Sequence, residues 1–173
     1  MDCYKVKFAG LEQGEHHYSF VIDKFFFEQF PETQIHNARV EIDLKMQLNK
    51  DLLTFHFFIK GDVEVECDRC LDSFFLPVKS EEKLYVEFGE ENSDISDADN
   101  RIMLSYNEVD VDLSKHIYDY VHLALPVRKV HPEDAAGHSQ CNEAMLNEIR
   151  NVNSKPEKDT DPRWDKLKEL FNN

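Results

Sequence analysis

Long apolar runs and cysteines are both scarce in this sequence, and their scarcity excludes several classes of protein. No window of eighteen residues is apolar enough to cross a membrane, so we expect no membrane contact. The opening MDCYKVKFAGLEQG lacks a basic segment followed by an apolar one, so we expect no signal peptide. Four cysteines in 173 residues are too few for a secreted disulfide scaffold. We therefore expect reduced thiols and a cytoplasmic protein.

Basic side chains are also in short supply. The chain has 20 Lys and Arg against 35 Asp and Glu, for a net charge of −15. A broad cationic face for a phosphate backbone is hard to build from this composition. Any contact with nucleic acid must be local, or must be made through a basic protein partner. Solubility alone would also explain the acidity.

Signatures of catalysis are missing as well. The sequence contains no glycine-rich phosphate loop and no serine nucleophile elbow. Asp110 and Asp112 suit the start of a helix better than a catalytic pair. We expect no enzymatic activity and no small-molecule substrate. A thiol-dependent enzyme using Cys67 or Cys70 stays open as an alternative.

What the sequence does contain is strong two-residue alternation. Residues 38–48, 53–65 and 74–88 each place apolar side chains on one face and polar ones on the other, which predicts three long antiparallel strands. The segments 111–125 and 161–171 have helical spacing, with Asp112 and Asp161 as their caps. We predict an α+β fold, with a long antiparallel meander and helices packed on one side. Barrel-like closure stays open, because alternation shows one buried face and not what covers it.

Several smaller features complete this organisation into a single domain spanning residues 1–173. Gly61 is read as a bulge, Phe58 breaks the alternation of its strand, and Pro77 suggests a sheet edge or a bend. Residues 142–150 form a short helix candidate. An acidic loop is expected at 89–100, and a polar linker at 151–160 before the C-terminal helix.

The two cysteines of VECDRCLDSF, Cys67 and Cys70, raise three alternatives. A redox pair needs a helix after the first thiol to lower its pKa, but a strand follows here. Two thiolates in a turn between strands can instead supply half of a tetrahedral zinc site. The third alternative is that both thiols are only buried packing groups.

The other half of a zinc site can come from VHPEDAAGHSQC, residues 130–141. This stretch holds His131, His138 and Cys141, and the last two repeat the spacing of Cys67 and Cys70. Four ligands can thus be drawn from five candidates.

Three motifs in this order resemble the YceD family, also called the DUF177 family, of bacterial and plastid proteins. The motifs are VECDRCLDSFFLPV, VDLSKHIYDYVHLALPVRKVH and DPRWDKLKEL, and the similarity covers roughly residues 37–171. The resemblance implies a non-enzymatic role in the accumulation of large-subunit (23S) ribosomal RNA, and hence in ribosome biogenesis. The implied partners are ribosomal RNA, a basic ribosomal protein or a pre-ribosomal particle. A small zinc-stabilised module that binds RNA or protein is the alternative.

The resemblance also bears on the metal. Many relatives carry a cysteine-rich segment after the Leu-Ala-Leu-Pro run, and Cys67 and Cys70 match the family's turn. His131 falls where the first of those cysteines would be, and Cys141 near the last. If a metal is bound, we expect zinc on Cys67, Cys70, His131 and Cys141, with His138 as the substitute. Arg69, Arg128 and Lys129 would then form a local basic spot for phosphate contacts.

Overall fold

The computed structural model describes residues 2–50, 52–89 and 100–153 of the chain. The chain divides into two compact units. The sheet unit comprises the chain up to Asp68 together with Ser73–Lys129. The smaller unit comprises Arg69–Asp72 and the chain from Val130 onward, including helix α3 (Glu143–Asn153), which matches the helix expected at 142–150. A single domain spanning residues 1–173 stays a prediction.

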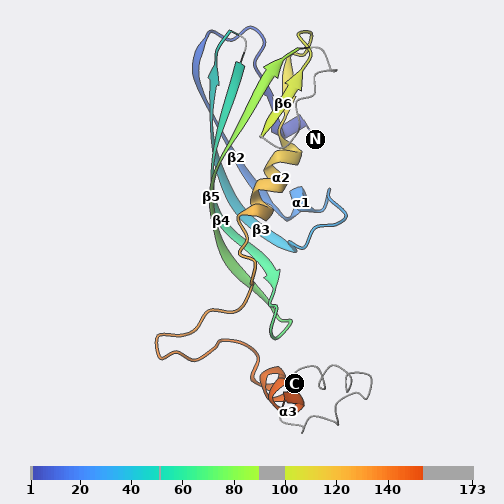
Figure 1. The fold of residues 1–173 in the computed structure, drawn as a ribbon, viewed down its shortest axis with the longest axis vertical. Coiled ribbons are helices and arrows are strands. Elements are labelled where there is room, and N and C mark those ends of the chain that lie inside the picture. Colours follow the sequence, from blue (N-terminus) through green and yellow to red (C-terminus); the bar gives the residue numbers. More distant parts are fainter. Residues whose placement is uncertain (1, 51, 90–99, 154–173) are drawn as a thin grey trace, which may run out of the picture. The chain divides into compact units, whose positions relative to one another are not determined.

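Five strands build the main sheet of the sheet unit, in the order β2-β3-β4-β5-β6 (Figure 1). Neighbouring strands are antiparallel except for β5 and β6, which are parallel. This confirms the predicted α+β class and the antiparallel meander. Strands β2 and β6 are the two edges, so the described sheet is open and does not close into a barrel. The strands are β2 (Gly14–Asp23), β3 (Asn37–Leu48), β4 (Leu52–Glu66), β5 (Ser73–Phe88) and β6 (Arg101–Leu104).

The alternation of the sequence sets which side chains form the core. The inward side chains of β3 from Val40 to Met46 are at most 1% exposed. On β4 the inward residues have the opposite parity, as predicted, and from Leu53 to Val65 their apolar side chains are also at most 1% exposed. Burying each such side chain contributes about 1.5–3 kcal/mol. The long strands are therefore held by their apolar face.

The expected bulge at Gly61 is wrong. The pairing of β3 with β4 runs without interruption from Asn37↔Glu64 to Leu48↔Leu53, and Gly61 lies directly opposite Val40. A Cβ atom at position 61 would meet the backbone oxygen of Arg39 and the Cα atom of Val40 at 2.6 Å. Glycine is present because two backbones approach closely at this point, not because a residue is inserted.

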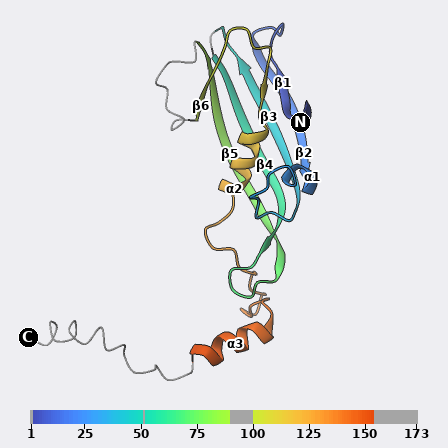
Figure 2. The same ribbon diagram turned by 90° about the vertical axis from the view of Figure 1, so that its right-hand side faces the viewer.

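Two helices lie on the concave side of the sheet (Figure 1, Figure 2). Helix α2 (Ser114–Leu123) buries Ile117, Tyr120 and Val121, and the Tyr120 ring lies 5.1 Å from that of Phe57. Helix α1 (Lys24–Phe27) is short and buries two aromatic rings. A second, two-stranded sheet pairs β1 (Lys5–Lys7) with β7 (Asp110–Asp112), next to the 3-10 helix η1 (Asp2–Tyr4). These elements supply the cover that the sequence predicted for one side of the sheet.

The predicted start of α2 needs a correction. Asp112 lies in β7 and is paired with Lys5, so Leu113 occupies the N-cap position and the helix begins at Ser114, one residue later than expected. The Asp112 carboxylate still accepts hydrogen bonds from the Ser114 backbone N–H at 2.9 Å and from the Ser114 hydroxyl at 2.6 Å. The strand pairing holds Asp112 extended, while its side chain still satisfies a donor of the first helical turn.

Tyr120 gives a testable prediction about the core. Its side chain is buried, and its hydroxyl has no hydrogen-bond partner among the described residues. Burial, followed by the nearby charges of Glu82 and Asp119, raises the pKa of Tyr120 to about 12. Tyr120→Phe removes a buried, unsatisfied hydroxyl, so we expect the free energy of unfolding to rise by about 1 kcal/mol at pH 7.

The pH dependence distinguishes this explanation from a simple packing effect. The unfolded chain releases the Tyr120 proton near pH 10 and the folded chain only near pH 12. Wild-type stability should therefore fall relative to Tyr120→Phe as the pH rises between these values. Urea unfolding of both proteins at pH 7 and pH 11 measures the difference. If the difference in unfolding free energy between the two proteins is the same at pH 7 and pH 11, the Tyr120 hydroxyl is not buried in this way.

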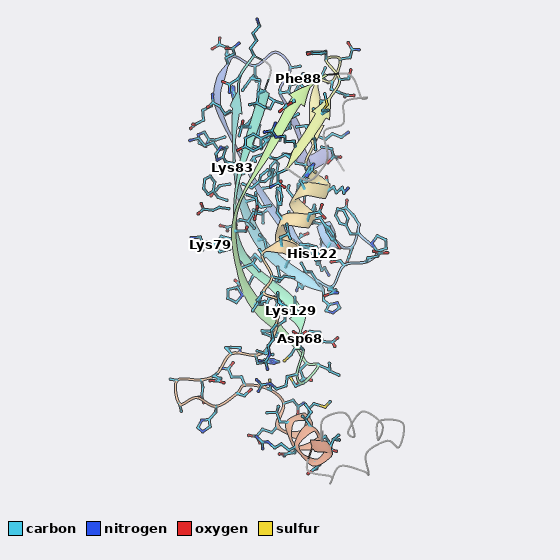
Figure 3. All side chains as sticks on the ribbon, in the orientation of Figure 1. Asp68, Lys79, Lys83, Phe88, His122 and Lys129 are labelled. Atoms are coloured by element: carbon cyan, nitrogen blue, oxygen red, sulfur yellow. The ribbon has the colours of Figure 1, made fainter. Side chains whose placement is uncertain are left out.

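The edge of β5 carries features that oppose pairing with another chain. Strand β6 pairs only with Tyr85–Phe88, so the rest of β5 has no partner on that side among the described strands. Pro77, Lys79 and Lys83 lie along this stretch, and Glu82 occupies an inward position of the strand. Figure 3 shows Lys79 and Lys83 on the side of the sheet away from α2. Proline, lysine and an inward charge are common protections of such edges, which confirms the edge expected at Pro77.

Three predicted features fall largely or wholly outside the described residues. They are the acidic loop at 89–100, the linker at 151–160 and the C-terminal helix at 161–171. Among the described helices, none is long and apolar enough to cross a membrane.

Candidate metal centre

The turn that joins β4 to β5 carries two of the candidate ligands, Cys67 and Cys70. The chain turns at Asp68–Cys70, and Leu71 adopts a left-handed backbone conformation with φ 64°. That conformation is costly for a residue with a side chain, at about 1–2 kcal/mol. Its presence directly after Cys70 shows that the turn is held by its surroundings, as is common at binding sites.

Cys67, Cys70, His131 and Cys141 offer ligand atoms that all lie within 4.8 Å of one another. Cys70, His131 and Cys141 belong to the smaller unit, and Cys67 precedes Cys70 by three residues in the same turn. The Sγ atom of Cys70 lies 3.4 Å from Nδ1 of His131. All three cysteines are buried and none forms a disulfide. These are the four residues that the sequence singled out.

The donor set fits zinc. Three thiolates and one imidazole are a common structural zinc set, and zinc–sulfur bonds of about 2.3 Å give a tetrahedron with edges of about 3.8 Å. The upper limit of 4.8 Å between the ligand atoms is therefore only slightly wider than a loaded site requires. Four protein ligands would also fill the tetrahedron, leaving no position for a catalytic water.

Hydrogen bonds join the turn to the segment that carries Cys141. Within the smaller unit, the Arg69 guanidinium donates to the Ser139 hydroxyl at 3.3 Å, and the Cys141 backbone N–H donates to the same oxygen at 3.2 Å. The Asn142 side-chain amide donates to the Asp72 carboxylate at 3.1 Å. Sequence reasoning missed Ser139 and Asn142. Asn142 could have been predicted as the cap of α3, because asparagine is common at helix N-caps. Its side chain does accept a hydrogen bond from the Ala144 backbone N–H at the start of α3.

A tight turn over residues 134–138 places His131 and Cys141 near each other. The chain folds back so that Glu133 pairs with Ser139, and Gly137 takes a positive φ of 81°. The Asp134 carboxylate accepts the backbone N–H groups of His138 and Ala136, which hold its pKa below the usual range. The Asp-x-x-Gly pattern is a turn signal that the sequence analysis did not use.

His138 is not part of the cluster that the structure forms. Its side chain is 80% exposed, and Nδ1 lies 3.4 Å from the Asp134 carboxylate. The spacing of His138 and Cys141 matches that of Cys67 and Cys70, but here it arises from an exposed turn. His131 supplies the fourth ligand atom instead.

The residues proposed as a basic spot have partners of their own. In the sheet unit, Lys129 donates its backbone N–H to Asp68 at 2.6 Å, and its ammonium group lies 3.7 Å from the same carboxylate. Figure 3 labels both residues near the lower end of the sheet. Arg128 is exposed. Arg69 lines a hollow of about 600 Å³ that also contains Glu133 and Glu143. Acidic groups thus accompany both Arg69 and Lys129, and a single positive spot stays a prediction.

Comparison with known proteins identifies the family. A family model described as "Large ribosomal RNA subunit accumulation protein YceD" matches residues 55–171, which include both cysteine segments. No curated protein and no solved structure matches the chain. Because the match covers well over half of its residues, the chain belongs to the YceD family.

Proposed function

We propose that this protein is a non-enzymatic ribosome biogenesis factor that promotes the accumulation of 23S ribosomal RNA in the bacterial cytoplasm. The observation that carries the proposal is the family match over residues 55–171, whose description names accumulation of the large ribosomal RNA and no reaction. The partner would be a pre-ribosomal particle, contacted through its RNA or through a basic ribosomal protein. The net charge of −15 limits any RNA contact to a small area.

The metal centre would serve this role as a structural element. Cys67, Cys70, His131 and Cys141 would hold zinc, which would tie the turn at 67–70 to the segment around 131–141. In the described part of the smaller unit the buried apolar side chains are Cys70 and Cys141, so a metal would supply folding energy to this part of the chain. The burial of all three thiols and the closed ligand set favour this role over a thiol-dependent enzyme.

A deletion strain tests the proposed function. Removing the gene from a bacterium that carries it should lower the ratio of 23S to 16S ribosomal RNA and the amount of free large subunits. Wild-type protein and Cys3→Ser should restore both, because Cys3 is exposed and lies outside the cluster. Cys70→Ser should fail to restore them. An unchanged 23S ratio in the deletion strain would refute the proposal.

A further inference from the structure

The outer face of the main sheet, away from α2, carries an aromatic side chain that the alternation does not explain. Phe58 occupies an outward position of β4 and is 42% exposed. No described element covers it. Hollows of about 540 Å³ and 170 Å³ lie on either side of its ring. An aromatic ring that is exposed beside such hollows offers an apolar surface on which a planar group can stack.

Lysines lie on both sides of Phe58 along the strands. Two residues before Phe58 on β4 lies His56. Its cross-strand neighbours are Lys45 on β3 and Lys83 on β5. Two residues after Phe58 lies Lys60, whose cross-strand neighbour on β5 is Lys79. Each two-residue step is about 7 Å along a strand. Glu41 on β3 is the other cross-strand partner of Lys60, so Phe58 lies between one row with two lysines and a histidine and one row with two lysines and a carboxylate.

These cations are only partly neutralised. Lys45 is paired with Glu15 at 2.6 Å. Among the described residues, no carboxylate lies within 4.0 Å of the ammonium groups of Lys60, Lys79 or Lys83. Partial burial, followed by the charges of Lys83 and Lys45, lowers the pKa of His56, while Glu15 opposes the shift. The charges of Lys83 and Lys45 thus add to an effect that is due mainly to burial.

The neighbours of Phe58 in its own row are acidic. Asp43 on β3 and Glu81 on β5 are its direct cross-strand partners. Carboxylates beside an aromatic ring cannot hold phosphates, but they can accept hydrogen bonds from the N–H groups of nucleobase edges. This face therefore offers a group for each part of a nucleotide chain. A base can stack on the Phe58 ring, its edge can donate hydrogen bonds to the carboxylates, and the phosphates can contact the lysines.

We propose that this face is a binding platform for single-stranded RNA, in which a base stacks on Phe58 and flanking phosphates contact Lys45, Lys60, Lys79 and Lys83. The proposal rests on the proposed ribosomal function and names the RNA contact within it. A protein partner fits less well, because interface cores are depleted of charge and this ring has charges on all sides. The chain's net charge makes the binding weak and strongly dependent on salt.

Fluorescence anisotropy tests the platform with the full chain, zinc-loaded if it binds zinc, and a labelled single-stranded RNA of roughly 12 nucleotides at low salt. Phe58→Ala should weaken binding by roughly 5- to 150-fold, the loss expected for one stacked base, and Phe58→Tyr should retain it. Phe75→Ala is the matched control, because Phe75 is 56% exposed on the same face but lies opposite Glu64. Lys60→Gln with Lys79→Gln should reduce the slope of log K against log salt by about 1.4.

The outcomes separate this proposal from the proposed function. Absence of RNA binding at low salt, or equal affinity for wild type and Phe58→Ala, would overturn the platform. A loss with Phe75→Ala as large as with Phe58→Ala would also overturn it. If Phe58→Ala restores 23S levels in the deletion strain as well as wild type does, the proposed ribosomal role is supported and the RNA-binding platform is refuted. A deletion strain with normal 23S levels would refute the ribosomal role, whatever the oligonucleotide result.

Discussion

Cys70→Ser is expected to remove one zinc ion per chain and to unfold the smaller unit. Replacing one thiolate opens the tetrahedron and leaves Cys67, His131 and Cys141 without the ion that holds them together. Structural zinc contributes an apparent ~10–16 kcal/mol to the folding of zinc-finger peptides, so its loss is a large change for a small unit. Elemental analysis of protein purified under reducing conditions would measure the stoichiometry. Limited proteolysis would report whether residues 130–153 become accessible.

The chain offers matched controls for this experiment. Cys3→Ser changes a cysteine that is exposed and outside the cluster, so zinc content should stay at one per chain. His131→Ala should lose the metal, whereas His138→Ala should keep it, because the His138 ring lies beside Asp134. Wild-type protein that contains no metal after purification with added zinc would contradict the metal centre. The thiols would then be buried packing groups.

Cys70→Ser should have little effect on the stability of the sheet unit. The core of that unit consists of side chains from the long strands and from α1 and α2. No side chain of this core belongs to the described residues 130–153. The β-sheet signal in circular dichroism should therefore persist in Cys70→Ser, while helix α3 becomes susceptible to protease.

The long strands were predictable because one physical signal decides them. Alternation along β3, β4 and β5 is nearly perfect, and a shift of one residue would move every apolar side chain to the wrong face. The edges of the sheet carried no such signal. The four residues of β6 pair in parallel with the end of β5, a long-range contact that no local pattern in Arg101–Leu104 indicates. Whether the sheet closes depends on such contacts, and this is why barrel closure could not be decided from the sequence.

The four residues of the metal cluster were predicted, but the preference for His131 over His138 came from the family resemblance and not from spacing. The cysteine spacing at 67–70 pointed to a turn, and residues 130–141 offered three more candidates. Choosing between His131 and His138 required the path of the backbone. That path is set by the turn at Asp134–Gly137, which leaves His138 at an exposed tip. Spacing alone left both histidines open, and the fold brings His131 to the thiols.

Gly61→Ala is expected to destabilise the sheet unit strongly, although local propensity predicts the opposite. Replacing glycine by alanine at a compatible position stabilises a protein by ~0.4–1 kcal/mol, because the unfolded chain loses freedom. At Gly61 the added Cβ would instead meet the backbone of Arg39 and Val40, with Val40 Cα at 2.6 Å. Backbone atoms in the middle of a paired strand cannot rotate away as a side chain can. Overpacking of this kind costs about 1–3 kcal/mol or more.

Thermal unfolding measures the sign of this change. A loss of about 3 kcal/mol lowers Tm by roughly 6–12 °C in a chain of this size. Lys60→Ala on the same strand is the control, since its exposed side chain faces away from the core and its removal should change Tm little. A Tm for Gly61→Ala at or above that of wild type would show that β3 and β4 can move apart at this point. In that case the close approach of Gly61 to Val40 would not be what requires glycine at this position.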